Sequence, residues 1–280
     1  MSNLDLAKQQ TLFNHLNQSK ATHAYFFCDQ GIITDLATQN AFLPLQKTLS
    51  SLTLEPQNAH TDNNILSLYV RSPLSPPEIQ AFGHEIAPIK AFVSACEPIS
   101  QGQILRAYHW FNWDQASQYC GQCGTDLPKL FHGTEKICRD CHLSLFPKFS
   151  PAVMVLIYRE NKVLLGRSAY FTPGVYSALA GFIDLGETAE QAAHREVKEE
   201  VGITLDKLRY FSSQSWPFPD RFMIAFTGEA REENIVIDPT ELEDAQWFDI
   251  NALPPLPHKA SIARQMIDKL LNQDNTANTP

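Results

Sequence analysis

The stretch Gly181-Phe-Ile-Asp-Leu-Gly-Glu187 is followed, after seven residues, by Arg195-Glu-Val-Lys-Glu-Glu-Val-Gly-Ile203. Amphipathic packing specifies where apolar residues fall, but most of the characteristic positions in this pattern are glycines or charged residues. No rule of core packing produces such a spacing. We therefore expect residues 181–203 to decide both the fold and the chemistry of the chain.

The middle of this segment predicts a helix. Thr188 and Gln191 have the spacing of a capping box, in which each side chain bonds the other residue's backbone N–H. Gly202 stands where a left-handed residue commonly ends a helix. We expect the helix to run from Ala189 to Val201.

On that helix Glu196, Glu199 and Glu200 fall at i, i+3 and i+4 and therefore share one face. Three carboxylates this close repel one another unless cations compensate, and Mg²⁺ and Mn²⁺ prefer oxygen ligands of this kind. We expect Arg195 to pair with Glu187 or Glu199 and to keep the acidic face in order. The alternative is a solvated acidic face without a ligand, but the glycines, Glu187 and Arg195 at their offsets favour a site.

Composition sets broader limits. The chain has 280 residues, 44% hydrophobic and 19% charged, and a formal net charge of −9. These values are typical of a globular protein of two domains with a small third insert. The charge argues against a general nucleic-acid groove, but it allows capture of an RNA end, because bound metals invert the local field. No run of about 18 apolar residues and no signal-like start occurs, so we expect no membrane contact and a cytoplasmic location.

Four of the six cysteines are patterned, as Cys120-x2-Cys123 and Cys138-x2-Cys141. Each pair suits a tight turn that presents two thiolates, and two such turns complete a tetrahedral zinc site. His142, beside the second pair, is an alternative ligand. Because four thiolates leave no open position, we expect a structural zinc ion, one per chain.

The chain is expected to divide into an N-terminal mixed α+β domain, a zinc ribbon, a catalytic α/β domain and a flexible tail, at residues 1–115, 116–148, 149–272 and 273–280. The first domain is interpreted as a scaffold or dimer interface. Short apolar runs predict its strands, at Ala24–Cys28, Ile65–Val70 and Ala91–Ala95. In the catalytic domain similar runs and a helical apolar spacing predict strands at 153–158, 163–165, 223–227, 235–237 and 245–248 and a helix at 261–271.

A second unusual stretch is Ser213-Gln-Ser-Trp-Pro-Phe-Pro-Asp-Arg-Phe-Met223. Pro217 and Pro219 restrict the backbone and hold Trp216 and Phe218 in an extended presentation. Rigid aromatic rings suit stacking on a base or a nicotinamide ring. The alternative is an aromatic loop packed into the core.

Residues 181–203 resemble the Nudix box, the signature of hydrolases that cleave a nucleoside diphosphate linked to another group. Residues 213–221 resemble S-Q-P-W-P-F-P-x-S, the hallmark of the NADH pyrophosphatase (NAD-capped RNA hydrolase) family within the Nudix superfamily. That family also has an N-terminal domain, a four-cysteine zinc ribbon and a Nudix domain in this order. The resemblance implies an α/β/α sandwich and a homodimer. It also implies cleavage of NADH or NAD⁺ to nicotinamide mononucleotide and AMP, and removal of NAD caps from RNA 5′ ends.

The same resemblance assigns roles to individual residues. The catalytic ligands of Mg²⁺ or Mn²⁺ would be Glu196, Glu199, Glu200 and Glu241, with Glu187 and Arg195 as supporting residues of the box. Two aromatic residues would contact the nicotinamide end across the dimer, namely Phe146 and Phe182. The nucleotide pocket would be lined by Gln214, Ser215, Trp216, Pro217, Phe218, Pro219, Asp220, Arg221 and Ala263.

Three residues depart from the family's pattern. Phe146 stands where tyrosine is common, so a hydroxyl contact is missing. Ser215 replaces the first proline of the hallmark and loosens the loop. Arg221 replaces its final serine. A guanidinium there would pair with a phosphate, such as a 2′-phosphate or the first phosphate of a capped RNA, or would point into solvent.

Two other functions stay open. One is a Nudix hydrolase for another nucleoside diphosphate derivative, such as ADP-ribose, a diadenosine polyphosphate or NADPH, because Ser215 and Arg221 depart from the hallmark. The other is a zinc-ribbon module that binds RNA or a nucleotide beside an inactive Nudix domain. The presence of every box glutamate and of Glu241 argues against that module.

Overall fold

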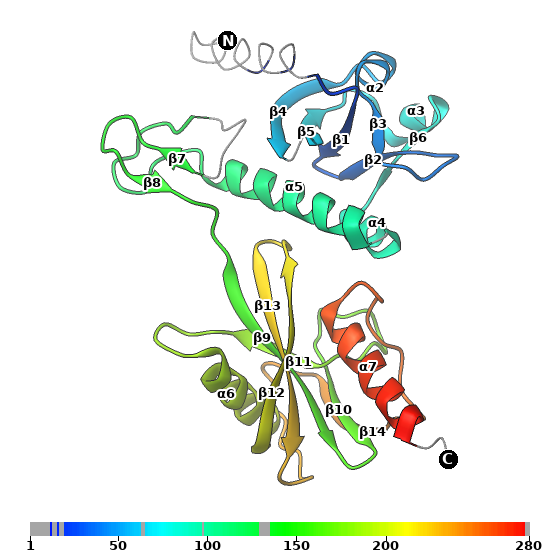
Figure 1. Ribbon diagram of the computed structural model, residues 1–280, viewed down its shortest axis with the longest axis vertical. Coiled ribbons are helices and arrows are strands. Elements are labelled where there is room, and N and C mark those ends of the chain that lie inside the picture. The colour runs from blue at the N-terminus through cyan, green and yellow to red at the C-terminus, as the bar shows by residue number, and fades with distance from the viewer. Residues whose placement is uncertain are drawn as a thin grey trace. The chain divides into compact units, whose positions relative to one another are not determined.

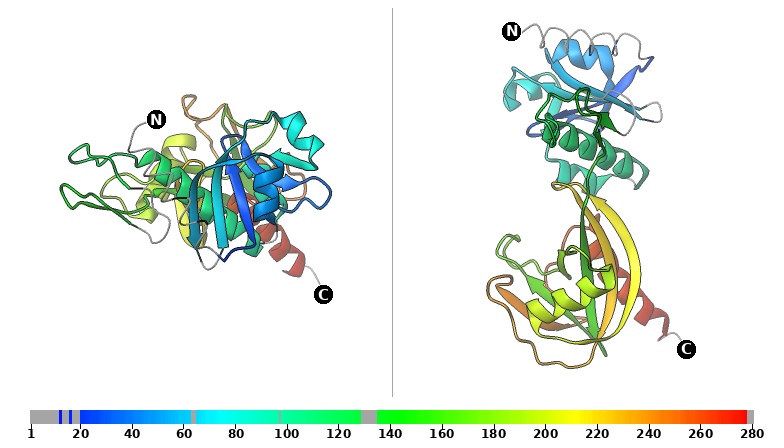
Figure 2. Two further views of the ribbon diagram at one scale, coloured as in Figure 1. Left: turned by 90° about the horizontal axis from the view of Figure 1, so that it is seen from above. Right: turned by 90° about the vertical axis from the view of Figure 1, so that its left-hand side faces the viewer.

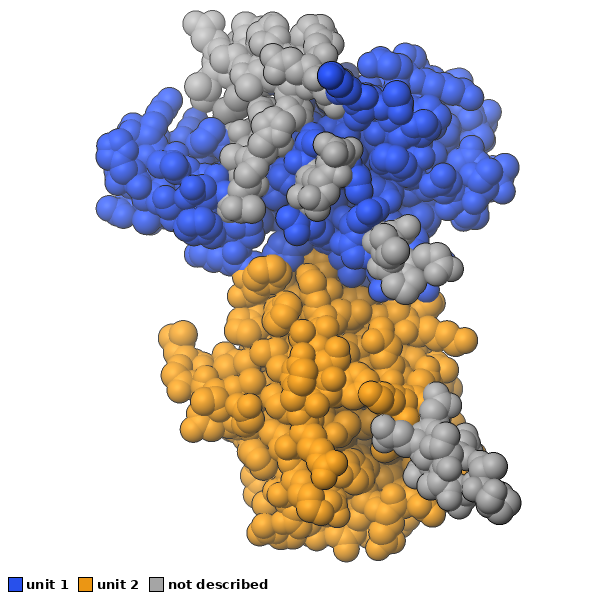
Figure 3. Space-filling view, viewed as in Figure 1, with its two compact units in different colours: residues 1–148 blue, residues 149–280 orange. Residues whose placement is uncertain are grey.

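The computed structural model describes residues 12, 16, 20–62, 65–96, 98–128 and 135–277. The chain divides into two compact units, Met1–Lys148 and Phe149–Pro280 (Figure 3). Each unit contains its own sheet and its own buried core. Within the described residues, no helix has the length and apolar character needed to cross a membrane.

The first unit is built on a six-stranded sheet with the order β4-β5-β1-β2-β6, and β3 pairs with β1. Its strands are β1 (His23–Cys28), β2 (Gly31–Asp35), β3 (Phe42–Pro44), β4 (Glu55–Asp62), β5 (Ile65–Arg71) and β6 (His84–Ala87). Its helices are α2 (Leu45–Ser51), α3 (Pro76–Ala81), α4 (Ile89–Ala95) and α5 (Pro98–Ala116) (Figure 1). The predicted strands at 24–28 and 65–70 are confirmed.

The prediction of a strand at Ala91–Ala95 is wrong, because these residues belong to helix α4. Ile89 and Val93 are buried and stand one helical turn apart, whereas Ala91 and Ala95 are exposed. Burial therefore follows a helical period and not the alternation of a strand. A run of five mostly small apolar residues is too short for the spacing of its apolar positions to distinguish a helix from a strand.

A buried ion pair connects three parts of the first unit. Lys136 lies in β7 (Lys136–Ile137), which pairs with β8 (Ser144–Leu145), and its Nζ lies 2.7 Å from Oδ1 of Asp114 in α5. Lys136 also donates to the carbonyl oxygen of Ser117 at 2.9 Å. Asn58 of β4 donates to the second carboxylate oxygen of Asp114. The four-cysteine segment, the long helix and the sheet are therefore joined by one polar network.

The second unit is a six-stranded sheet with the order β12-β13-β9-β10-β14, and β11 pairs with β9. Its strands are β9 (Ser150–Arg159), β10 (Lys162–Arg167), β11 (Leu179–Phe182), β12 (Leu205–Trp216), β13 (Arg221–Ala230) and β14 (Asp244–Asp249). Helices α6 (Ala189–Val201) and α7 (Ile262–Ala277) lie on opposite faces of this sheet (Figures 1 and 2).

Alternate residues of β9 show how the two layers form. Val153 and Val155 pack in the core that contains α6, whereas Ala152 and Leu156 pack in the core that contains α7. A central strand buried on both faces needs apolar residues at nearly every position. The predicted α/β/α sandwich is confirmed, as are the strands predicted at 153–158, 163–165, 223–227 and 245–248.

Two predictions in this unit need correction. Residues 235–237 form no strand, although Ile235 and Ile237 pack against the α6 side of the core. The last turn of a helix has carbonyl groups without helical partners, and the Val236 N–H donates to the Val201 carbonyl oxygen at 2.9 Å. Helix α7 continues beyond residue 271 to Ala277 because no glycine or proline interrupts it. The last residues of the predicted tail, 278–280, lie outside the described residues.

Candidate active site and metal centre

Helix α6 begins and ends where the sequence predicts. The Gln191 N–H donates to Oγ1 of Thr188 at 3.2 Å, and the Thr188 N–H donates to Oε1 of Gln191 at 2.9 Å, so both halves of the capping box form. Gly202 adopts φ 73°, the left-handed conformation that ends a helix. These caps set the rotation of the helix and therefore the direction in which its glutamates point.

Arg195 is the centre of the acidic cluster. Its Nε and Nη2 donate to the two oxygens of Glu187 at 2.7 and 2.8 Å, a bidentate pair. Its Nη1 donates to Glu196 at 2.8 Å and to Glu199 at 3.0 Å. Its Nη2 also reaches the carbonyl oxygen of Phe182 at 2.9 Å. All five N–H donors of this guanidinium are therefore used within the protein.

Gly181 makes room for the carboxyl group of Glu196. A Cβ atom added at position 181 would overlap that carboxyl group, which lies directly against the glycine. The Glu196 carboxyl group can therefore lie against β11, where it also accepts a hydrogen bond from Arg195. The sequence marked this glycine only by its spacing, and the close approach explains why the position needs one.

Glu200 is the most buried of the three helix glutamates, with 5% of its surface exposed. Burial raises its pKa to about 8, and the nearby charges of Glu196 and Glu241 add to this shift. Burial likewise raises the pKa of Glu196, although Arg195 opposes the change. Oε2 of Glu200 is buried without a hydrogen-bond partner among the described residues. A carboxylate with a free buried oxygen, facing further carboxylates, has the chemistry of a hard divalent cation site.

Glu241 comes close to this cluster from a separate loop. The Asp238 N–H donates to the carbonyl oxygen of Glu200 at 3.0 Å, which attaches the loop to the last turn of α6. The Asp238 side chain then accepts from the N–H and the hydroxyl of Thr240 at 2.8 and 2.7 Å. Leu242 is buried in the α6 side of the core. Between these anchors Glu241 lies near enough to raise the pKa of Glu196 and Glu200.

The aromatic stretch forms the tip of the β12–β13 hairpin. Trp216 ends β12, and its ring meets that of Phe218 edge-on at 5.1 Å between centroids. Pro217 is buried. Asp220 accepts from the N–H and the hydroxyl of Ser150 at 2.9 and 3.0 Å, which attaches the tip to β9. Phe218 and Pro219 take part in further contacts.

Gln214 joins the hairpin to α7. Its side chain donates to the carbonyl oxygen of Ala260 and accepts from the N–H of Ile262, both at 2.8 Å. Ala263 is buried in the core beneath. Ser215 is half-buried and stands opposite Phe222 in the pairing of β12 with β13. Within the described structure the side-chain amide of Gln214 therefore holds the start of α7 by hydrogen bonds. The residue spacing in the sequence did not predict this role.

Arg221 and Phe182 lie together, which the sequence did not predict. The guanidinium carbon of Arg221 is 5.3 Å from the centroid of the Phe182 ring. Phe182 is 49% exposed and follows Gly181 at the end of β11. Phe146 is 55% exposed and belongs to the first unit, whereas the other residues predicted to contact the nucleotide belong to the second.

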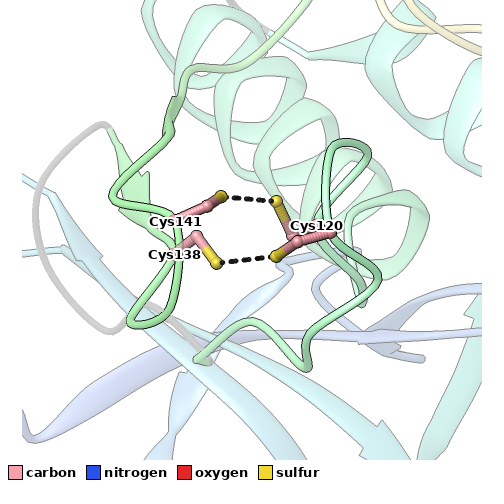
Figure 4. Close-up of side chains that lie close together, drawn as sticks. Cys120, Cys138 and Cys141 are labelled. Atoms are coloured by element: carbon pink, nitrogen blue, oxygen red, sulfur yellow. Dashed lines mark hydrogen bonds between the residues drawn. The ribbon is translucent and has the colours of Figure 1, made fainter.

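The four patterned cysteines come together in the first unit. The sulfur atoms of Cys120, Cys123, Cys138 and Cys141 all lie within 4.8 Å of one another. The two knuckles face each other, with Sγ–Sγ distances of 3.5 Å between Cys120 and Cys141 and between Cys123 and Cys138 (Figure 4). Zn–S bonds of about 2.3 Å in a tetrahedron place sulfurs about 3.8 Å apart. The four thiols therefore have the arrangement of a closed metal site.

Comparison with known proteins agrees with this geometry. Residues 148–270 match the family model of the NUDIX domain. The chain is 46% identical over 168 residues to a protein of Pseudomonas aeruginosa named NAD-capped RNA hydrolase NudC, a match that covers 60% of each chain. It is 45% identical over 171 residues to the protein of that name from Chromobacterium violaceum, covering 61% of this chain and 64% of the relative.

These matches span less than two thirds of the relatives' own length. Among solved structures, a NUDIX hydrolase from Nitrosomonas europaea superposes with a TM-score of 0.45 at 22% identity, covering 58% of this chain and 94% of that chain. The family model covers the acidic helix, the hairpin and the start of α7 alike. Residues 148–270 therefore form a Nudix domain.

Proposed function

We propose that this protein hydrolyses the diphosphate of NADH and NAD⁺ to nicotinamide mononucleotide and AMP, and that it removes NAD caps from RNA 5′ ends. The observation that carries the proposal is the buried carboxylate of Glu200, which has one oxygen without a hydrogen-bond partner among the described residues and has Glu196 and Glu241 beside it. The similarity to proteins named NAD-capped RNA hydrolase supports the choice of substrate.

Glu196, Glu199, Glu200 and Glu241 would hold Mg²⁺ or Mn²⁺. When bound, such ions polarise the diphosphate and lower the pKa of a water that attacks phosphorus. Arg195 fixes the carboxylates of Glu196 and Glu199 before any ligand arrives, so little reorganisation is needed on binding. Glu187 neutralises Arg195 through its bidentate pair and keeps the guanidinium in place.

The aromatic residues of the second unit would bind the nucleotide. Trp216 and Phe218 present ring edges and faces at the hairpin tip, and Phe182 presents an exposed ring at the end of β11. Rings held by backbone restraints lose little conformational entropy when a base stacks on them. Gln214 would act by holding the start of α7, with Ala263, beside the hairpin.

The four cysteines would bind one structural zinc ion. Their closed arrangement leaves no position for a substrate. The buried pair of Lys136 and Asp114 connects this segment to α5, so zinc binding would stabilise the first unit as a whole.

We further propose that the protein is a cytoplasmic homodimer. Phe146 is exposed, which supports its contact with a second copy of the chain, as the family resemblance implies. The six cysteines are free thiols in the structure, which supports a reducing compartment. Sedimentation of the purified protein would test the dimer.

A substrate panel tests the proposed reaction. Purified protein with Mg²⁺ or Mn²⁺ is given NADH, NAD⁺, NAD-capped RNA, ADP-ribose and a diadenosine polyphosphate, and nucleotide products are separated by chromatography. We expect the largest kcat/KM for an NAD-containing substrate, with AMP and a nicotinamide mononucleotide in equal amounts from NADH. A larger kcat/KM for ADP-ribose or the diadenosine compound would overturn the assignment.

A further inference from the structure

Arg221 is a cation that has no anionic partner in the part of the chain that the structure describes. Its guanidinium lies over the Phe182 ring, its side chain is exposed, and within the described residues it forms no ion pair. The neighbouring Asp220 is bonded to Ser150 instead. Other arginines of the second unit are paired with carboxylates: Arg159 with Glu233, Arg167 with Glu243, Arg231 with Asp206 and Arg264 with Asp268.

The strand register explains why Arg221 meets Phe182. Phe182 stands opposite Ala152 on β9, and Met223 stands opposite the same residue from the other side, so all three side chains point to the α7 face. Arg221 lies two residues before Met223 on the same face and reaches across the end of β9. Trp216 stands opposite Arg221 in the hairpin. Arg221, Phe182 and Trp216 therefore lie on the same face of the sheet, at the same end.

Phe182 also links this face to the acidic cluster. Its carbonyl oxygen accepts from Arg195, and the preceding Gly181 lies against Glu196. Adjacent residues of a strand point to opposite faces. The acidic cluster and Arg221 therefore lie on opposite faces of the sheet, and both contact the end of β11.

The two arginines differ in what they can still bind. Arg195 has all five donors engaged by Glu187, Glu196, Glu199 and the Phe182 carbonyl group. The guanidinium carbon of Arg221 lies 5.3 Å from the centroid of the Phe182 ring, and within the described residues no hydrogen bond or ion pair uses the N–H donors of this side chain. Two edge donors of an arginine match two oxygens of a phosphate.

We propose that Arg221, held in place by the Phe182 ring, is a binding subsite for a second phosphate on the ribose of the nucleotide that stacks beside Trp216. The ligand class is an adenosine nucleotide that carries a 2′- or 3′-phosphate in addition to its 5′-diphosphate. The 2′-phosphate belongs to a small dinucleotide, and the 3′-phosphate belongs to a continuing RNA chain. The proposal rests on the proposed function for the identity of the nucleotide, but its test measures binding alone.

The test compares three small probes by isothermal titration calorimetry at low salt with Mg²⁺: AMP, adenosine 2′,5′-bisphosphate and adenosine 3′,5′-bisphosphate. We expect one bisphosphate to bind wild type about tenfold more tightly than AMP, the size of one charge-assisted contact at an exposed site. Whichever bisphosphate gains affinity identifies the source of the phosphate. Equal affinity for all three probes would overturn the proposal.

Variants then assign the gain to Arg221. Arg221→Ser is expected to reduce the tenfold advantage to less than about twofold, and Arg221→Lys to keep part of it, because lysine retains the charge without the planar fork. Phe182→Leu is expected to lose about half of the gain, since the guanidinium loses its support. Arg209→Ser, an exposed arginine of β12, removes the same charge and is expected to keep the full advantage.

Three results would contradict this assignment. An advantage that survives Arg221→Ser overturns the subsite, and one lost equally in Arg209→Ser shows a general effect of charge. Full retention in Phe182→Leu overturns the role of the Phe182 ring in holding Arg221. Hydrolysis of NADH is measured separately in wild type, so a failure of the proposed reaction and a failure of the phosphate subsite give different results. Far-ultraviolet circular dichroism confirms that each variant is folded.

Discussion

The Cα atom of Gly181 lies so close to the carboxyl group of Glu196 that a Cβ atom at position 181 would overlap it. The backbone of Gly181 does not adopt the left-handed conformation that usually explains a glycine. The glycine makes room for the Glu196 side chain, and the two parts of the quoted stretch, separated by Thr188 and the first part of α6, therefore meet at this contact.

Gly181→Ala should displace Glu196 from its place against β11. A shift of about 1 Å in a catalytic group can lower activity by about 100-fold, and we expect a loss of at least this size in kcat/KM. The measurement is steady-state hydrolysis of NADH, with circular dichroism as a check on folding. Gly102→Ala is the matched control, because a Cβ there meets open space within helix α5. Retention of wild-type activity in Gly181→Ala would contradict the contact.

The pKa of Glu187 is lowered to about 2, first by hydrogen bonds from Arg195 and then by the N–H of Asp184. Since this pKa lies below the unfolded value of about 4.3, ionised Glu187 stabilises the fold above about pH 4.3, and the contribution is lost as the pH falls toward 2. We expect the difference in free energy of unfolding between wild type and Glu187→Gln to shrink below about pH 4. A difference that stays constant down to about pH 3 would argue against the pair.

Lys136→Met should destabilise the first unit. The side chains of Lys136 and Asp114 are 1% and 2% exposed, so removal of the lysine leaves a buried carboxylate without its cation. Such a loss costs about 3–5 kcal/mol. Chemical denaturation measures it, and Lys47→Met, an exposed lysine of α2, should change the free energy of unfolding by less than about 0.5 kcal/mol. Equal effects of the two changes would show that the buried network contributes nothing.

Metal analysis of the purified protein should find about one zinc ion per chain. Cys138→Ser removes one of four thiolates and is expected to abolish tight zinc binding and to lower the thermal midpoint of the first unit. Cys96→Ser changes a cysteine outside the cluster and is expected to retain the zinc. Zinc retained in Cys138→Ser, or absent from wild type, would show that the four thiols serve another purpose.

Local signals made the acidic helix predictable. The Thr188–Gln191 capping box and Gly202 depend on neighbouring residues alone, so their spacing gave the helix bounds that the structure shows. The cysteine knuckles are local in the same way, and only their meeting is a tertiary fact. The burial of β9 on both faces could also be expected from an apolar run that ends at turn residues.

Contacts between distant parts of the chain were not predictable. The strand predicted at 91–95 failed because burial of Ile89 and Val93, set by packing on the sheet, decides the period. In the segment at 235–237 the Val236 N–H donates to the last turn of α6, so this backbone group has a hydrogen-bond partner without a neighbouring strand. The position of Arg221 over Phe182 depends on the register of three strands, which the sequence does not specify.

The most direct test of the central claim, that the carboxylates around α6 carry out hydrolysis, is the rate of AMP release from NADH in Glu200→Gln and Glu190→Gln at saturating Mg²⁺. Both changes replace a carboxyl group on the same helix by an amide, but Glu200 is buried beside Glu196 and Glu241, whereas Glu190 is exposed in the first turn. We predict a loss of at least about 1000-fold in kcat for Glu200→Gln, because metal-ion catalysis supplies several kcal/mol, and near wild-type rates for Glu190→Gln. Comparable rates in the two variants would contradict the assignment of this cluster as the catalytic centre.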